Sequence, residues 1–330
     1  MGGFGVIRRI AATRLLSAST LCYGRMPISI VASSGLYSAK GFRATRYGRG
    51  TSRQGVIRIA KHSTSSTSGA HPEEIERFSA LASDWWNEFG SMAALHSMND
   101  IRIPWIRDCL VQAGSSLETN RSTLSSGKLA RSVQPLKGNV ILDVGCGAGL
   151  LCEPLARLGA AVTGIDATES VIQAAEAHAK LDQALSTCEL NYYNLSIEDF
   201  EQRCSHTEPF TKFDAVVASE IIEHVPNPEQ FVSSCFSVLR HGGLLFVTTL
   251  NRTLASRILG IWAAERLLQV VPRGIHNWDQ FVTPTELTAM VERTGGLVTL
   301  LHGLRYNPTS NRWTWQSNRS INYALVAEKV

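Results

Sequence analysis

The stretch ILDVGCGAG, residues 141–149, decides the fold. β-Branched and aliphatic residues in its first half predict a buried strand, and glycines stand at alternate positions in its second half: Gly145, Gly147 and Gly149. Glycine lets the backbone bend sharply and approach a ligand where any Cβ would collide. A second apolar run ends at Asp166, where an acid can hydrogen-bond the ribose of a nucleotide cofactor. Strand, loop and acid together predict an α/β protein that binds a nucleoside-containing cofactor.

The loop also discriminates between cofactor classes. A dinucleotide loop has the pattern G-x-G-x-x-G, which seats a pyrophosphate on the next helix, whereas this loop reads G-x-G-x-G. Asp143 stands two residues before the first glycine. There it would repel a pyrophosphate but attract the amino and sulfonium cations of S-adenosylmethionine. The charge pattern therefore favours S-adenosylmethionine and disfavours a nicotinamide-dependent dehydrogenase, while a glycine-rich turn without a ligand is the simplest alternative.

The basic character of the chain is confined to its beginning. Residues 1–72 contain no Asp or Glu but eleven Lys or Arg, and removing these from the net charge of +4 leaves −7 on the remainder. Apolar residues interspersed with Arg and Ser are typical of a mitochondrial transit peptide. We therefore expect a transit peptide and disordered linker over residues 1–70, with a Ser/Thr linker at 63–68. The alternative is a basic arm that binds nucleic acid, but the acidic body predicts no nucleic-acid partner.

The cysteine pattern indicates the redox compartment, and the lengths of the apolar runs show whether a segment could span a bilayer. The seven cysteines form no C-x-x-C pair, which suits a reducing compartment such as the matrix or cytosol. No run of 18 or more apolar residues exists that could span a bilayer.

Alternating strand and helix patterns after residue 139 predict a seven-strand, doubly wound α/β sheet. The expected strands are 139–144, 161–165, 188–193, 213–219, 243–250, 297–303 and 322–328, and the helices between them are 149–158, 170–181, 228–239 and 284–294. Before the sheet we expect a lid or packing helix over 73–89, a helix around 104–113 and a polar loop over 114–133. Residues 71–330 are therefore expected to form one domain.

An apolar segment at about 254–272 interrupts this alternation as an inserted helix. It is too short to cross a membrane and is apolar on most sides, so it is either buried or rests in a lipid interface. Four arginines in and around it, at 252, 257, 266 and 273, favour the interface.

A second constellation, SEIIEHVPNP at residues 219–228, follows the predicted strand 213–219. Ligands of open α/β sheets bind at the carboxyl ends of strands. If residues 220–224 form one helical turn, Glu220, Glu223 and His224 point the same way. This set could hold Mg²⁺ or Zn²⁺, and the hard carboxylate oxygens favour Mg²⁺. His224 could instead serve as a general base, but only if it is not a metal ligand.

Together with GLLFVTTLNR at 243–252, VPRGIH at 271–276, LRYNP at 304–308 and Trp85-Trp86, these motifs closely resemble the ubiquinone-biosynthesis O-methyltransferase family from about residue 72 to the C-terminus. The resemblance implies the class I S-adenosylmethionine-dependent methyltransferase fold. It implies cofactor contacts at Arg102, Gly145, Asp166 and Ser219, and a metal at Glu220, Glu223 and His224. Gly147 allows the same close approach of the backbone as Gly145.

The resemblance further implies O-methylation of polyprenyl-dihydroxybenzoate and demethylubiquinol, as a matrix enzyme peripheral on the inner membrane. Other ubiquinone-biosynthesis proteins are expected as partners in a complex. A metal would favour the oxyanion of a catechol hydroxyl, which then attacks the sulfonium methyl in line. Two alternatives from this pathway are a C-methyltransferase, which needs no metal set, and a non-catalytic scaffold subunit.

Overall fold

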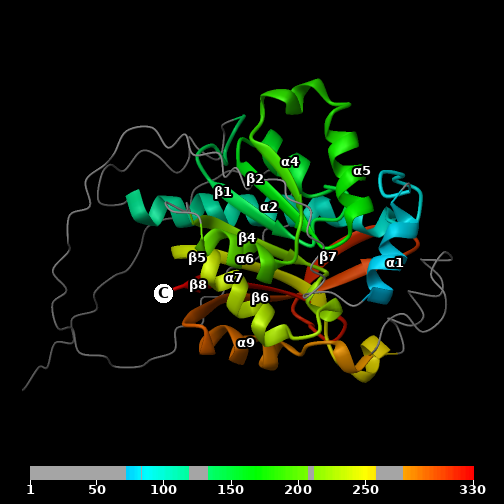
Figure 1. Cartoon of the computed structure of the whole chain (residues 1–330). Coiled ribbons are helices and arrows are strands. Elements are labelled where there is room, and N and C mark those ends of the chain that lie inside the picture. The colour runs from blue at the N-terminus through cyan, green and yellow to red at the C-terminus, as the bar shows by residue number, and fades with distance from the viewer. Residues whose placement is uncertain (1–71, 83, 119–132, 207–211, 258–277) are drawn as a thin grey trace, which may run out of the picture. The chain divides into compact units, whose positions relative to one another are not determined.

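The structure is a computed structural model that describes residues 72–82, 84–118, 133–206, 212–257 and 278–330. The expected transit peptide, the Ser/Thr linker and most of the apolar segment at 254–272 lie outside these residues (Figure 1). The boundaries of the leader and the inserted helix therefore stay predictions. No helix of the described residues has the length and apolar character to cross a membrane.

Eight strands of the described residues form one sheet, in the order β3-β2-β1-β4-β5-β8-β6-β7 (Figure 1). Their bounds are β1 Val140–Val144, β2 Ala161–Asp166, β3 Leu190–Asn194, β4 Phe213–Ser219, β5 Leu239–Leu250, β6 Gly296–Asn307, β7 Arg312–Gln316 and β8 Asn322–Lys329. The strands from β3 to β5 pair in parallel, whereas β8, β6 and β7 join by antiparallel pairing. The expected α/β sheet is confirmed, but the count of seven strands misses β7, which pairs with β6 as a hairpin.

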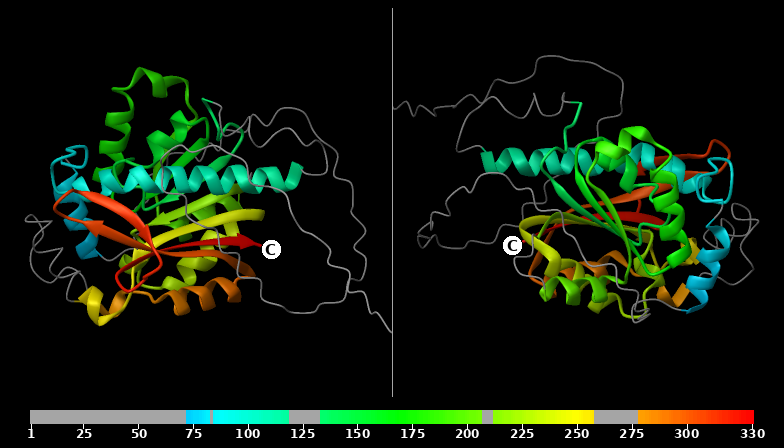
Figure 2. Two further views of the ribbon diagram at one scale, coloured as in Figure 1. Left: turned by 180° about the vertical axis from the view of Figure 1, so that it is seen from behind. Right: turned by 45° about the horizontal axis from the view of Figure 1, so that its top comes forward.

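Helices cover both faces of the sheet (Figure 2). The α-helices are α1 Pro72–Leu81, α2 Ala93–Glu118, α4 Cys152–Arg157, α5 Glu169–Ala179, α6 Ile197–Ser205, α7 Pro228–Val238 and α9 Pro284–Arg293. Side chains alternate between the two faces of a strand, so Leu142 and Val144 of β1 pack with α6, α7 and α9. Ile141 points to the other face and packs with α2, α4 and α5. Burial of these strands on both sides explains their nearly continuous apolar sequence.

The N-terminal elements differ from the expectation. A single helix over 73–89 is wrong, because α1 ends at Leu81 and tight turns follow. The Asp84 carboxylate accepts hydrogen bonds from the Ser91 backbone and hydroxyl and from the Asn87 amide, which stabilises turns in place of a helix. The loop expected over 114–133 is wrong for residues 114–118, where α2 continues, and residues 119–132 lie outside the described part.

The parallel strands bring their carboxyl ends to one edge. Val144 at the end of β1 lies opposite Ile165 of β2 and Ala218 of β4. The glycine loop, Asp166 and Ser219 therefore meet at this edge, although they lie far apart in the sequence. The short turn η2, Ile222–His224, begins at the same edge after β4.

Candidate active site

The backbone conformation at three positions of the loop requires glycine. Gly145, Gly147 and Gly149 have φ angles of 69°, 53° and 88°, a region that other residues rarely adopt. A Cβ on Gly147 would lie 2.2 Å from ring carbons of Trp85. The backbone N–H groups of Gly145 and Cys146 both donate to the Ile165 carbonyl, which holds the start of the loop against β2.

Asp166 lies at the end of β2 and orders the loop beside it. Its Oδ2 accepts a hydrogen bond from the Gly147 N–H at 3.0 Å, and its Oδ1 accepts one from the Thr168 N–H at 2.8 Å. Burial nevertheless raises the pKa of Asp166, because the charged form loses its hydration. Each carboxylate oxygen can accept a second hydrogen bond, so the expected contact with ribose hydroxyls stays open to this residue.

Asp143 is 2% exposed and lines the same pocket. Burial raises the pKa of this carboxyl to about 6, and its Oδ2 accepts a hydrogen bond from the Cys152 thiol at 3.1 Å. A buried acid of this kind gains free energy from a cation placed beside it. Its place next to the glycine loop agrees with attraction of a cationic donor rather than a pyrophosphate.

Arg102 projects from α2 into the pocket and is 5% exposed. Its Nη1 donates to the Ser219 hydroxyl at 2.6 Å, and its Nε and Nη2 donate to Asn99 Oδ1. The Asn99 amide in turn donates to the Leu150 carbonyl after the glycine loop. The structure thus brings Arg102 and Ser219 together as expected, and it adds Asn99, which no local sequence signal identifies.

The segment between α1 and α2 lies directly over the loop. Trp86 Nε1 donates to the Ala148 carbonyl at 3.1 Å, and its ring stacks on His178 with centroids 3.4 Å apart. Trp85 and Met92 pack with Ala148 and Leu150 in a small apolar cluster. The expectation that this region packs or covers the site is therefore confirmed, although turns rather than a helix carry the two tryptophans.

The acid end of the site differs from the prediction of one helical turn over residues 220–224. Glu220 has a φ of 54° and precedes η2, so only residues 222–224 form the turn. Glu223 is 3% exposed and its Oε2 accepts a hydrogen bond from the Thr249 hydroxyl at 2.7 Å. The side chains of Glu220, Glu223 and His224 therefore do not line up on one helical face.

The ionised form of Glu220 is disfavoured in this arrangement. Burial first, and then the neighbouring Glu223 charge, raise the pKa of Glu220 to about 7. Its Oε1 is buried and has no hydrogen-bond partner among the described residues. A cation would suit this pair of acids, but no three His, Cys, Asp or Glu side chains in the described part of the chain are placed to hold a metal ion. The predicted ligand set is thus not assembled here.

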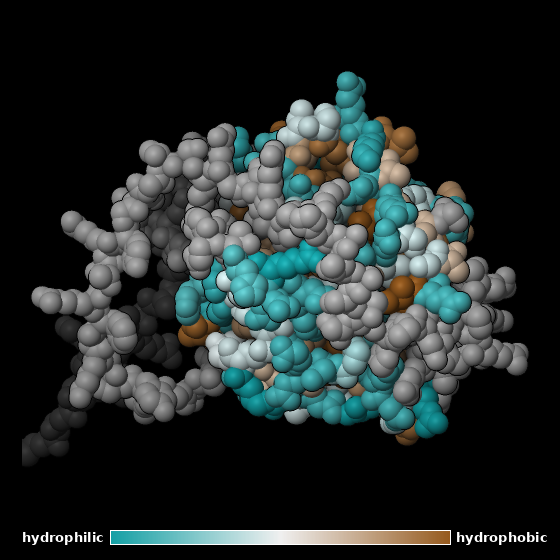
Figure 3. Space-filling view, viewed as in Figure 1, coloured by the Kyte–Doolittle hydropathy of each residue, from teal (hydrophilic) through white to brown (hydrophobic). Residues whose placement is uncertain are grey.

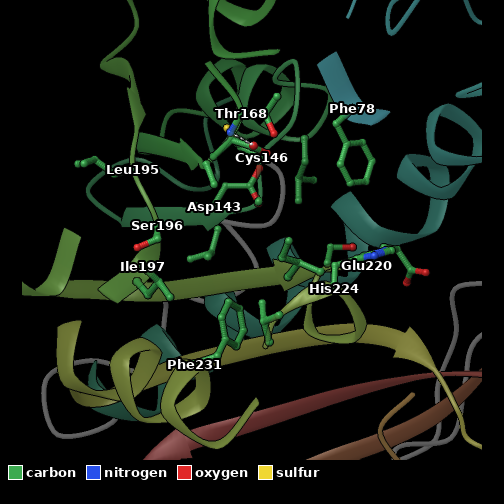
Figure 4. Close-up of a pocket in the computed structure, with 18 of the residues that line it drawn as sticks. Phe78, Asp143, Cys146, Thr168, Leu195, Ser196, Ile197, Glu220, His224 and Phe231 are labelled. Atoms are coloured by element: carbon green, nitrogen blue, oxygen red, sulfur yellow. Dashed lines mark hydrogen bonds between the residues drawn. The ribbon is translucent and has the colours of Figure 1, made fainter. Parts of the chain in front are cut away.

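A row of aromatic rings connects the glycine loop with the turn η2 after β4. The Phe78 ring from α1 lies 6.3 Å from Trp85 over the loop and 5.8 Å, edge to face, from His224. Figure 4 shows Phe78, Glu220 and His224 at one end of the pocket and Leu195, Ser196 and Ile197 at the other. The pocket thus has mixed apolar and polar lining at the β3 end, is charged along the glycine loop, and is aromatic and acidic after β4.

These features define the class of protein. A family model described as a methyltransferase domain matches residues 118–299. A solved magnesium protoporphyrin IX methyltransferase from Synechocystis with bound SAH is similar at a TM-score of 0.47 and 16% identity, covering 78% of this chain and 99% of that one. The family model shows that the chain is a methyltransferase, so the expected class I fold is confirmed and the dehydrogenase alternative is wrong.

Curated relatives narrow the class to a family. The mitochondrial ubiquinone biosynthesis O-methyltransferase of Mus musculus is 43% identical over 81% of this chain, and the chain spans 66% of its length. The Rattus norvegicus protein of the same name is 43% identical over 82% of this chain and 72% of its own length. The ubiquinone biosynthesis O-methyltransferase of Nitrobacter winogradskyi is 41% identical over 78% and 90%. The chain belongs to the ubiquinone biosynthesis O-methyltransferases, which confirms the expected S-adenosylmethionine-dependent enzyme class.

Proposed function

We propose that the chain transfers the methyl group of S-adenosylmethionine to a hydroxyl of polyprenyl-dihydroxybenzoate and of demethylubiquinol. The observation that carries this proposal is the pocket itself, which combines a glycine loop and Asp166 for a nucleoside with an acidic and aromatic end after β4. The names of the relatives support an acceptor from ubiquinone biosynthesis.

The donor is held by residues of the loop and its neighbours. Asp166 accepts hydrogen bonds from the ribose, Arg102 and Ser219 bind the amino-acid end, and Asp143 attracts the cationic groups. Gly145 and Gly147 leave room for the donor against the backbone. These assignments place the sulfonium methyl near the end of β4, where the acceptor enters.

At the acceptor end, we assign proton removal to His224. A phenolic hydroxyl is mostly protonated at neutral pH, so a general base accelerates its attack. The acceptor oxygen forms a bond to the methyl carbon as the sulfur–carbon bond breaks, the hydroxyl proton passes to the imidazole, and S-adenosylhomocysteine leaves. Because the donor is already activated, orientation supplies much of the remaining rate.

Metal binding is the alternative role for the same residues. Mg²⁺ held by Glu220, Glu223 and His224 would lower the pKa of a bound hydroxyl, and the unpaired Glu220 Oε1 suits a cation. Glu223, however, is engaged with Thr249, so the arrangement described here does not provide that site. Full turnover after exhaustive chelation would exclude the metal, whereas loss of turnover restored by Mg²⁺ would exclude His224 as the base.

The direct test of the proposed function is methyl transfer from isotopically labelled S-adenosylmethionine to a short-tail dihydroxybenzoate, followed by mass spectrometry. We expect labelled methyl on oxygen. Label on a ring carbon would make the chain a C-methyltransferase, and donor binding without any transfer would favour a scaffold subunit.

We also propose a location in the mitochondrial matrix, peripheral on the inner membrane, with other ubiquinone-biosynthesis proteins as partners. The acid-free leader and the mitochondrial names of the mammalian relatives support the compartment. Leu254, at the start of the apolar segment, is 71% exposed. On the face shown in Figure 3, the apolar residues among those drawn in colour gather in small groups. Liposome binding that is unchanged in the double variant Ile258→Glu, Trp262→Glu would contradict membrane contact by this segment.

A further inference from the structure

Trp85 carries a buried polar atom for which the described residues provide no partner. The side chain is 7% exposed and lines the pocket. Its Nε1 is fully buried and has no hydrogen-bond partner among the described residues. An indole N–H can only donate, and a buried donor without an acceptor costs on the order of 1–3 kcal/mol. Such a group in a binding pocket points to an acceptor on the ligand.

The position of the Trp85 ring is fixed from two sides. Its Cζ3 and Cη2 carbons are the atoms that a Cβ on Gly147 would meet, so this edge of the indole rests on the glycine loop. The opposite edge carries Nε1. The Trp85 carbonyl accepts a hydrogen bond from His96 at 2.8 Å when His96 Nε2 is protonated, and the neighbouring Trp86 is tied to Ala148. The indole is therefore preorganised beside the loop.

Arg102, in the same pocket, has no anionic hydrogen-bond partner in the part of the chain that the structure describes. Its side-chain hydrogen bonds there go to the neutral oxygens of Asn99 and Ser219, and burial lowers its pKa despite the charges of Asp143 and Glu220. A carboxylate would stabilise this buried guanidinium directly. The α-carboxylate is the one anionic group of S-adenosylmethionine and is chemically suited to both donors.

We propose that Trp85 is a binding residue for the methyl donor, and that its Nε1–H donates a hydrogen bond to the donor's α-carboxylate beside Arg102. This inference rests on the proposed function, because it takes S-adenosylmethionine as the ligand. It adds a role to the turn between α1 and α2: the turn covers the loop and also recognises the amino-acid end of the donor.

The test compares two ligands on the full chain by calorimetry, S-adenosylmethionine and its decarboxylated form, which keeps the sulfonium and the amine. Trp85→Phe retains an aromatic ring but lacks the N–H. We expect it to weaken binding of S-adenosylmethionine about tenfold, as for a hydrogen bond to a charged group, and to leave binding of the decarboxylated form within about twofold. The ratio of the two affinities is insensitive to a partly folded sample, since both ligands are titrated into the same protein.

Trp105→Phe is the matched control. Trp105 Nε1 is also buried and finds no partner within the described ranges, but the ring packs on Phe246 and Trp315 and does not line the pocket. We expect this variant to bind both ligands as the unmodified chain does. Equal weakening of both ligands by Trp85→Phe, or no weakening of either, would overturn the inference. Failure of the unmodified chain to bind S-adenosylmethionine would instead overturn the proposed function.

Discussion

The donor end and the acceptor end of the pocket are built in different ways. The framework of the donor end is one continuous segment, β1 and its glycine loop, supported by Asp166 through backbone hydrogen bonds. The acceptor end has no such framework: Phe78 comes from α1 and His224 from η2, and Thr249 of β5 donates a hydrogen bond to Glu223 beside them. Local sequence therefore specifies the framework of the donor end, whereas tertiary contacts specify the acceptor end and the donor residues that other elements supply.

The largest expected effect concerns the donor end. Gly147→Val adds a side chain at a φ of 53°, where the Cβ alone would overlap Trp85. The unfavourable backbone costs on the order of 1–2 kcal/mol before the collision is counted. We expect no measurable binding of S-adenosylhomocysteine by calorimetry and a lower melting temperature.

The control for this variant is Gly114→Ala in α2, where nothing lies within 4 Å of an added Cβ. Alanine is favoured over glycine in a helix by about 1 kcal/mol, so we expect unchanged donor binding and an unchanged or higher melting temperature. Donor binding by Gly147→Val would show that the loop does not approach its ligand as closely as the comparison requires.

The next effect isolates the acceptor end. His224→Gln should lower kcat by about 100-fold or more, the scale of a lost general base. The affinity for S-adenosylhomocysteine should stay within about twofold, because the donor contacts proposed above do not include this side chain. If donor affinity and kcat fall together, the two ends do not act independently and the comparison fails.

These differences show which features a sequence can reveal. The strand patterns, the glycine loop and Asp166 depend on local spacing, and seven of the eight described strands were predicted close to their places in the structure. Helix α6 was missed although Ser196 caps it by accepting a hydrogen bond from the Asp199 N–H, a signal that was available. Strand β7 was missed in the same way, although its alternating RWTWQ pattern is a strand signal that was available.

The acceptor end lacked such signals. The helical spacing of Glu220 and Glu223 predicted one face, but the left-handed backbone at Glu220 breaks that periodicity. The sheet places Thr249 beside Glu223, and no sequence spacing encodes that pairing. At the donor end the same holds for Asn99 and Trp85, which reach the site through the packing of the N-terminal segment on the loop.

A smaller effect tests how the acids of the acceptor end are held. Thr249→Val keeps the shape of the side chain but removes the hydroxyl that donates to Glu223. Because a buried carboxylate then loses a hydrogen bond, we expect Thr249→Val to lower the free energy of unfolding by about 1–3 kcal/mol. Urea denaturation at neutral pH measures this change. In a Glu223→Gln background the same change should cost less, since the hydroxyl then donates to a neutral amide rather than to a charged carboxylate. An equal cost in both backgrounds would show that Thr249 does not act through the charge.

The smallest expected effect returns to the donor end and uses pH. Burial raises the pKa of Asp143 to about 6, so in the free protein its charge is lost as the pH falls through that value. This raised pKa makes its contribution to folding largest at low pH, and the contribution declines as the pH rises from about 4 to about 6. A cationic donor favours the ionised form, so affinity for S-adenosylmethionine should rise up to about tenfold between pH 5 and pH 7 and then level off.

Two variants separate Asp143 from Glu220, another acid of the pocket whose pKa is raised. Asp143→Asn should bind S-adenosylmethionine more weakly at pH 7 and should lose the rise between pH 5 and pH 7. Glu220→Gln should retain that rise, although the pKa of Glu220 is also raised, to about 7. If the rise disappears with Glu220→Gln and persists with Asp143→Asn, the acceptor end rather than the loop senses the donor's charge, and the division between the two ends would have to be redrawn.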